Sequence, residues 1–149
     1  MRETIFRGKR LDDDIWVYGD IISKFSCLKK VIIVECGYIQ NDVDSATVGQ
    51  FTGLLDKNAQ KIYEGDIVVQ HRQIWFDGGT PTYRSVIVWR HSQWQAKTYC
   101  TTLGKKGISH GTFFRLNDTG LNDGAKTEWE IIGNICDNPY LIKKGKLTC

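Results

Sequence analysis

Residues 48–69 read Val-Gly-Gln-Phe-Thr-Gly-Leu-Leu-Asp-Lys-Asn-Ala-Gln-Lys-Ile-Tyr-Glu-Gly-Asp-Ile-Val-Val, and this stretch decides the fold. Apolar residues on both sides of Asp56, Lys57 and Asn58 predict two strands joined by a turn. Asp and Asn favour turns because their side chains bond the local backbone and tolerate positive φ. A second tight turn at 64–66 leads into another apolar run at 67–69. The stretch therefore predicts sheet structure, but it indicates no biochemical activity.

The rest of the chain also reads as short extended segments separated by turn residues. Runs rich in β-branched and aromatic residues predict strands. The predicted strands are 5–6, 15–22, 30–39, 67–76, 83–90, 94–99 and 127–135, and Asn138 is expected to cap one short helix at 139–144. No sustained 3.6-residue apolar period accompanies them. A mainly β, mostly antiparallel fold follows, in which 62–135 are expected to close as a small five-stranded barrel.

Two regions are expected within the chain. Residues 1–60 are predicted to form an N-terminal β region packed on the barrel, and residues 61–149 to form the barrel itself. An irregular insert at about 100–127, in which only 112–116 looks structured, interrupts the second region. An ordered insert of that length in a compact domain is usually functional. The chain has 149 residues, so it can bury a core without a disulfide or a metal.

Charge and cysteine content bear on the class of protein. Twenty Lys and Arg against 17 Asp and Glu give a net charge of +3, which is below that of a dedicated nucleic-acid binder. The five cysteines form no close pair, and the N-terminus carries no apolar signal segment. No apolar run approaches the ~20 residues that a membrane span needs. We therefore expect a cytoplasmic protein with reduced thiols and no membrane association.

Several separated blocks of the sequence together resemble the YopX-like family of phage and prophage proteins. The blocks are 6–9, 16–19, 47–54, 56–58, 62–68 and 130–135 with 138–139. The resemblance covers about residues 5–142 and implies an SH3-like barrel, an origin in a bacteriophage or integrated element, self-association and no established activity. The family often has Gly where this chain has Ala59. Because positive φ at Ala costs on the order of 1 kcal/mol, we expect a turn of changed type there.

The family motif residues have a structural explanation in turns, bulges and core packing. They are Gly49, Phe51, Gly53, Tyr63, Glu64, Gly65, Asp66, Gly133 and Asn134. Nothing in these motifs requires a ligand.

Catalytic and metal chemistry find little support in the sequence. The nearest thiol and imidazole pairs, Cys27 with Cys36 and Cys100 with His110, are too widely spaced for a typical zinc site, and His91 and Cys136 stand alone. The segment 120–127 resembles a phosphate-binding loop, but a strand is predicted to follow it instead of the required helix. A small hydrolase using Cys100 or Ser109 with a histidine is an alternative. We expect no cofactor, no metal and no enzymatic activity.

Two kinds of binding remain open. A nucleic-acid face would use Arg72, Arg84, Arg90, Lys97 and Trp94, with Trp75, Trp89 and Tyr99 nearby. Strand alternation separates Trp89 from Arg84 and Arg90, which weakens this hypothesis. Sheet edges and an irregular insert suit contacts with a host protein, a phage protein or other copies of the chain. We favour a non-enzymatic phage accessory protein acting through protein contacts or self-association, with a nucleic-acid-binding module as the alternative.

Overall fold

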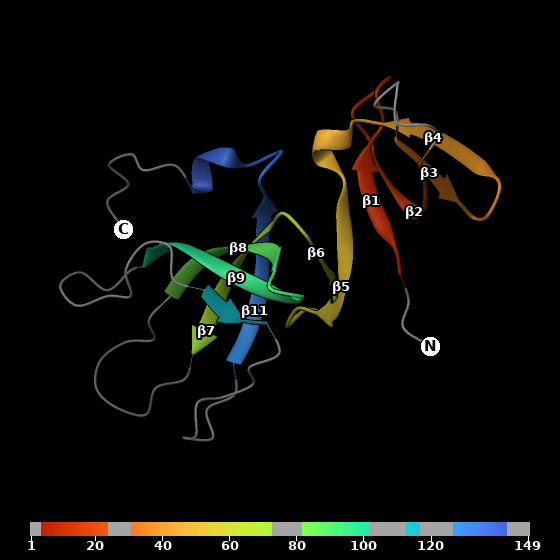
Figure 1. Cartoon of the computed structure of the whole chain (residues 1–149). Coiled ribbons are helices and arrows are strands. Elements are labelled where there is room, and N and C mark those ends of the chain that lie inside the picture. Colours follow the sequence, from red (N-terminus) through yellow and green to blue (C-terminus); the bar gives the residue numbers. More distant parts are fainter. Residues whose placement is uncertain (1–3, 24–30, 73–81, 102–112, 117–126, 143–149) are drawn as a thin grey trace, which may run out of the picture. The chain divides into compact units, whose positions relative to one another are not determined.

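The computed structural model describes residues 4–23, 31–72, 82–101, 113–116 and 127–142. The chain divides into two compact units, Met1–Leu54 and Leu55–Cys149. Regular structure in the described residues consists of two antiparallel sheets and two short 3-10 helices (Figure 1). The expectation of a mainly β protein with little helix is confirmed.

The first unit is built on strands β1 to β5, hydrogen-bonded in the order β4-β3-β2-β1-β5. Their bounds are β1 Phe6–Lys9, β2 Trp16–Ser23, β3 Val31–Glu35, β4 Ile39–Val43 and β5 Gly49–Leu55. Side chains alternate between the two faces of a strand, and Val17, Ile33 and Val43 form a buried cluster. Gly8 faces this cluster, because a Cβ there would lie 3.1 Å from Ile33 Cδ1 and from Val43.

The predicted single strand at 30–39 is a hairpin in the structure. Strand β3 ends at Glu35 and β4 begins at Ile39 because Cys36 and Gly37 both adopt positive φ, 52° and 80°, and reverse the chain. Consecutive positive φ values are the mark of a type I′ hairpin turn. The run 32–34 is buried, as expected for a strand covered on both faces. The 3-10 helix η1 (Ser45–Thr47) then leads into β5.

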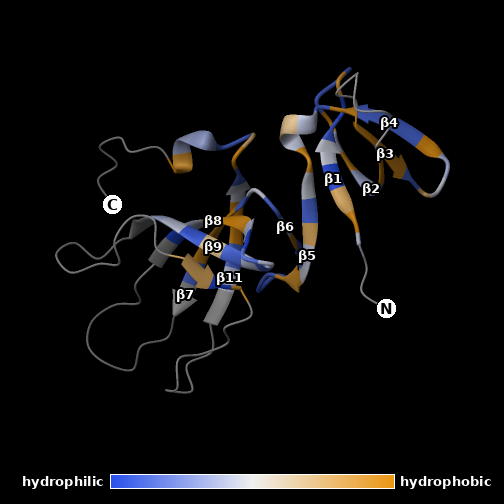
Figure 2. Ribbon diagram, viewed as in Figure 1, coloured by the Kyte–Doolittle hydropathy of each residue, from blue (hydrophilic) through white to orange (hydrophobic). Residues whose placement is uncertain are grey.

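The second unit contains a five-stranded antiparallel sheet in the order β10-β9-β8-β7-β11. Its strands are β7 Asp66–Arg72, β8 Thr82–Arg90, β9 Gln93–Thr101, β10 Phe113–Arg115 and β11 Thr127–Asn134, preceded by the short β6 (Lys61–Tyr63). Ile62, Ile67 and Ile87 are fully buried. Figure 2 shows hydrophobic residues interspersed with hydrophilic ones along the strands of both sheets, as expected for strands with one buried face.

The sheet of the second unit is open in the part of the chain that the structure describes. Strands β10 and β11 are its two edges. The closed five-stranded barrel expected for 62–135 is therefore wrong for these residues, because β10 has only three residues and pairs with β9 alone. The run 67–69 lies in β7, as predicted. Apart from its ends and β10 with Leu116, the predicted insert lies outside the described residues.

The turn between β5 and β6 is held by the carboxylate of Asp56. Its Oδ1 accepts hydrogen bonds from the backbone N–H groups of Asn58 at 2.8 Å and Gln60 at 2.9 Å. Its Oδ2 accepts a hydrogen bond from the N–H of Ile131, in β11, at 3.2 Å. Burial alone would raise the pKa of Asp56, but these hydrogen bonds outweigh it and hold the pKa below its ordinary value.

Ala59 lies in this turn with a φ of 62°, so the expectation of a changed turn type is wrong. The backbone N–H of Ala59 donates to the carbonyl oxygen of Asp56 at 3.1 Å. The turn keeps a left-handed residue because the bonds to the Asp56 carboxylate fix the backbone on both sides of it. A local strain of about 1 kcal/mol is tolerated where the surrounding structure determines the conformation in this way.

The motif residues around β5 and the turn after β6 take packing and backbone positions. Gly49, Phe51, Tyr63, Glu64 and Asp66 are buried or half-buried. Gly53 and Gly65 have positive φ, 84° and 81°, where a Cβ would be strained. The Asp66 carboxylate accepts a hydrogen bond from the Tyr63 N–H at 2.8 Å and so closes the turn between β6 and β7.

The helix predicted at 139–144 is a shorter 3-10 helix, η2 (Pro139–Leu141), and Asn138 makes no side-chain cap bond to it. Instead the Asn138 side chain packs on Gly133, where a Cβ would lie 2.4 Å from Asn138 Oδ1. The Asn134 side chain accepts hydrogen bonds from the N–H groups of Cys136 and Asp137, both at 2.9 Å. Gly133 and Asn134 therefore shape the exit from β11.

Candidate nucleic-acid interface

Three of the cations predicted for a nucleic-acid face lie on one face of the second sheet. Arg84 and Arg90 have the same parity along β8, so strand alternation puts them on the same side. Lys97 of β9 is the register partner of Val86 in β8, and directly paired residues share a face. Figure 1 shows β8 and β9 next to each other. The sheet therefore brings Arg84, Arg90 and Lys97 together.

The other two predicted residues do not join them. Trp94 pairs with Trp89 in the β8–β9 register, and their rings meet edge to face with centroids 4.8 Å apart on the opposite face. Trp94 is only 8% exposed, which makes it a core residue. Arg72 is the last residue of β7, and its side chain lies outside the described part of the structure. Trp89 lies opposite Arg84 and Arg90, as strand alternation predicts.

Two aromatic rings share the face with the cations. The Arg90 guanidinium lies 4.2 Å from the ring centroid of Phe113, in β10. Lys97 Nζ lies 5.3 Å from the ring centroid of Tyr99 and 5.9 Å from that of Phe113. Cation and ring therefore alternate along the line Arg90, Phe113, Lys97 and Tyr99. Cation–π contacts of this kind hold long basic side chains against the sheet.

We call this surface the basic-aromatic face. It consists of Arg84, Arg90, Lys97, Tyr99, Phe113 and Arg115. Arg115 joins it because Arg115 pairs with Gln95, and Gln95 has the parity of Lys97. Arg90 and Arg115 are exposed, and the other four residues are half-buried. None of the four cations forms a salt bridge in the part of the chain that the structure describes.

The charge of this region is unbalanced in the sequence as well. Residues 78–117 contain no Asp or Glu and six Lys or Arg, whereas the whole chain has 17 acidic residues. Residues 112–116 are expected to be structured within the insert, and β10 confirms this, but Phe113 and Arg115 were not assigned to this face because the pairing of β10 with β9 cannot be read from the sequence. The acid-free run is the signal that would have drawn attention to both residues.

Gln95 lies within this face with an unmet hydrogen-bonding capacity. Its side chain is 93% buried, since only 7% of it is exposed, and its Oε1 has no hydrogen-bond partner. Its register neighbours are Val88 on one side and Arg115 on the other. A buried acceptor without a donor is costly, at about 1–3 kcal/mol. This oxygen is covered by its neighbours, so it is a local cost of packing and not a contact point for a ligand.

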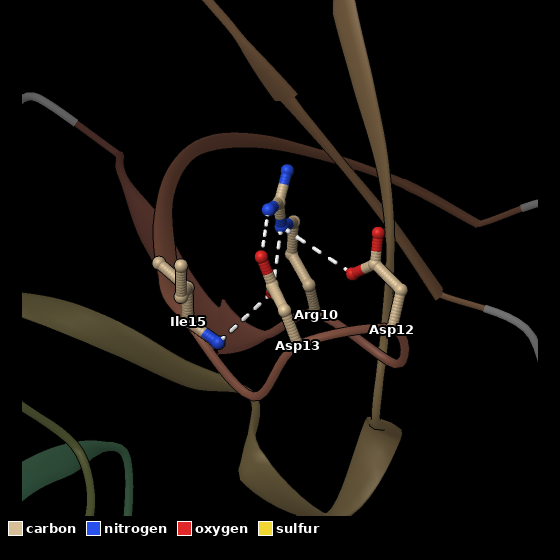
Figure 3. A network of polar contacts seen from close by, with 4 residues as sticks. All are labelled: Arg10, Asp12, Asp13 and Ile15. Carbon is tan, nitrogen blue, oxygen red and sulfur yellow. Dashed lines mark hydrogen bonds and ion pairs between the residues drawn. The ribbon is translucent and has the colours of Figure 1, made fainter.

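A second polar cluster lies in the first unit, between β1 and β2. Arg10 donates through Nε to Asp13 Oδ1 at 2.9 Å and through Nη2 to Asp13 Oδ2, and Asp12 Oδ1 lies 3.4 Å from Nε (Figure 3). The hydrogen bond from Arg10 lowers the pKa of Asp13 to about 2. A hollow of about 730 Å³ adjoins Arg10, Ile32 and Asp42. Because Asp12 and Asp13 both pair with Arg10, this cluster holds the turn together and offers no free cation to a ligand.

The remaining candidate residues are not assembled into a site within the described residues. No group of three or more His, Cys, Asp and Glu side chains there is placed to hold a metal. Cys36 and Cys136 are exposed, and His91 lies in the β8–β9 turn with φ 50°. Cys27, Ser109, His110 and the side chain of Cys100 lie outside the described residues. The phosphate-loop-like segment is followed by β11, a strand, which removes the helix that such a loop needs.

No helix in the described residues is long and apolar enough to cross a membrane.

Comparison with known proteins places the whole chain in a family. The structure of protein EF1440 from Enterococcus faecalis is similar at 18% sequence identity and a TM-score of 0.49, over 96% of this chain and 100% of that one. The comparison with curated proteins gives no match. The family model described as YopX protein matches residues 6–143. The resemblance carried by the motifs is thereby confirmed, and the chain belongs to the YopX protein family.

Proposed function

We propose that this protein binds nucleic acid through the basic-aromatic face and catalyses no reaction there. The observation that carries the proposal is the grouping of Arg84, Arg90, Lys97 and Arg115 on one face of β8 to β10, in a part of the sequence without acidic residues. Cations without carboxylate partners attract phosphates, which supply most of the affinity of non-specific nucleic-acid binding. A modest net charge for the whole chain is compatible with this, because four cations on one face create a local positive potential.

The expected salt dependence follows from the number of cations. If all four contact phosphates, the logarithm of affinity falls with the logarithm of salt concentration with a slope of about −2.8 on a single strand and about −3.6 on a duplex. Raising the salt from 50 to 200 mM then weakens binding by on the order of 50- to 150-fold. A neutral binding surface would show almost no slope.

Fluorescence anisotropy with a labelled oligonucleotide tests the proposal. Replacing Arg90 and Lys97 together by Ala should weaken binding and reduce the slope by about 1.4 to 1.8 units, because two phosphate contacts are lost. Lys61→Ala is the matched control, since Lys61 is exposed in β6 and outside the face. Binding that is absent in the unmodified protein, or equally weakened by Lys61→Ala, would refute the proposal.

A second function, protein contact including self-association, is supported by a different observation. Six of the large apolar side chains exposed by 44% or more belong to the first unit: Leu11, Ile15, Tyr18, Ile22, Tyr38 and Ile39. Tyr18 and Ile22 have the same parity along β2 and so lie on one face of that sheet. Grouped exposed apolar side chains mark interaction surfaces. Light scattering after size-exclusion chromatography tests self-association by measuring the molar mass in solution. A monomer mass at all concentrations, the same for the unmodified protein and for the Tyr18→Ser, Ile22→Ser double variant, counts against it.

The setting of both functions is part of the proposal. Family membership supports an accessory protein of a phage or prophage, acting in the cytoplasm of the bacterial host. An SH3-like curvature of the second sheet is likewise proposed on the family resemblance. Affinity capture from host cells, with and without nuclease, distinguishes nucleic acid from a host or phage protein as the partner.

A further inference from the structure

We infer that the basic-aromatic face takes single-stranded nucleic acid, with bases stacked on Phe113 and Tyr99 and a phosphate held between them by Lys97. This inference rests on the proposed function and names its substrate class. The two rings come from different strands, β10 and β9, and both lie near Lys97 on one side of the sheet. Both rings are half-buried, so part of each remains open to a ligand.

The Lys97 ammonium lies close to both aromatic rings. Lys97 Nζ is within 6 Å of both ring centroids, at 5.3 and 5.9 Å, so the two centroids are at most about 11 Å apart. A short run of nucleotides has a phosphate between successive bases, and an ammonium between two rings is placed to meet it. Stacking of successive bases on aromatic side chains along a basic groove is the general mode of single-strand binding.

The Arg90 guanidinium adds a second planar surface. It already lies 4.2 Å from the Phe113 ring centroid, and Arg90 is exposed. Guanidinium planes stack on unpaired bases as aromatic rings do. A base entering beside Phe113 would therefore meet a ring and a guanidinium together.

The bases of a duplex are not available to stack on the Phe113 and Tyr99 rings. Each base of a duplex is covered on both sides by its neighbours, so stacking on a protein ring requires unstacking the duplex first. A duplex would therefore contact only the cations. The inference predicts that the rings contribute to single-strand affinity and contribute nothing to duplex affinity.

The experiment compares labelled single strands of about 20 nucleotides, as DNA and as RNA, with the same DNA annealed to its complement. Phe113→Leu and Tyr99→Leu remove the rings but retain apolar volume. Each should weaken single-strand binding by about 5- to 160-fold, which converts from ~1–3 kcal/mol per stacked base, and leave duplex binding unchanged. Trp89→Leu is the control, because Trp89 is 52% exposed on the opposite face of the same sheet. Circular dichroism of each variant checks that the sheet remains folded.

The outcomes separate this inference from the proposed function. Tighter binding of single strands, lost on removal of either ring but not of Trp89, supports it, and the DNA and RNA arms show which strand is preferred. Equal affinity for single strand and duplex, unaffected by Phe113→Leu and Tyr99→Leu, overturns the inference and leaves nucleic-acid binding in place. Absence of binding to all three oligonucleotides overturns both. Displacement of the single strand by polyglutamate of equal charge also overturns the inference, because it would identify a surface for any polyanion.

Discussion

Replacing Asp56 by Asn tests how much one carboxylate contributes to joining the β5–β6 turn to β11, where Lys57 also donates its N–H to the Trp129 carbonyl oxygen and pairs with Glu130, both at 2.8 Å. Asp56 is 7% exposed and accepts three backbone hydrogen bonds, two through Oδ1 and one through Oδ2. Asn retains one oxygen. In its less costly orientation that oxygen still accepts from Asn58 and Gln60, and the amide NH₂ then faces the N–H of Ile131.

The size of the destabilisation follows from the loss of this one hydrogen-bond acceptor. A hydrogen bond to a charged group contributes about 1.5–3 kcal/mol, and a buried N–H left without an acceptor costs about 1–3 kcal/mol. Both values refer to the loss of the same hydrogen bond from the Ile131 N–H, so they are not added together. We expect Asp56→Asn to lower the free energy of unfolding by about 2–3 kcal/mol. Asp44→Asn is the matched control: Asp44 is exposed and caps η1 through one bond, to the Ala46 N–H, and Asn caps as well as Asp.

Urea denaturation followed by tryptophan fluorescence measures the effect. Trp89, Trp94 and Trp129 all belong to the second unit. With a slope of about 2 kcal/mol per molar urea, the midpoint for Asp56→Asn should fall by about 1 M, with the slope unchanged. The free energy of unfolding of Asp44→Asn, calculated from its urea midpoint, should stay within about 0.5 kcal/mol of that of the unmodified protein. If both variants shifted by the same small amount, the turn would be joined to β11 by the contacts of Lys57 with Trp129 and Glu130 and not by the Asp56 carboxylate.

Three further predictions follow from the same structure. Ala59→Gly should raise the free energy of unfolding by about 1 kcal/mol, because Gly adopts a φ of 62° without strain; a lower urea midpoint contradicts this. The pKa of Asp56 is lowered in the folded state, so its stabilisation is complete above the unfolded-state pKa and is lost as pH falls through the folded value. Stability measured from pH 6 downward should therefore fall less for Asp56→Asn than for the unmodified protein, and parallel curves count against the assignment. Gly19→Ala should lower the free energy of unfolding by about 1–3 kcal/mol, since its Cβ would lie 2.0 Å from the carbonyl oxygen of Val34. A melting temperature like that of the unmodified protein would exclude this close approach.

Local chemistry made much of the fold predictable from sequence. The positions of β2, β7, β8 and β9 follow from runs of β-branched and aromatic residues between turn residues. The hairpin at Cys36 and Gly37 was missed because only Gly37 is a recognised turn residue, and Cys36 adopts positive φ under the constraint of the β3–β4 pairing. Ala59 was misjudged for a related reason: the Asp56 bond to Ile131 is a long-range contact that no local pattern encodes.

The candidate site was only partly predictable. Parity within β8 places Arg84 with Arg90, and a hairpin at His91 and Ser92 brings β9 beside them. The contribution of Phe113 depends on β10 pairing with β9 across an intervening segment, and such a non-local pairing cannot be read from periodicity. Trp94 was grouped with the cations on composition alone, whereas the register places it on the other face.

The central claim is that β8, β9 and β10 present one surface that nucleic acid occupies. The most direct test is the change in backbone amide chemical shifts of isotope-labelled protein when an unlabelled single strand of about 20 nucleotides is added. We predict salt-sensitive shifts concentrated at Arg84, Lys97, Tyr99, Phe113 and their strand neighbours, with the first unit unaffected. Shifts that are absent at low salt, or centred on Tyr18 and Ile22, would contradict the account.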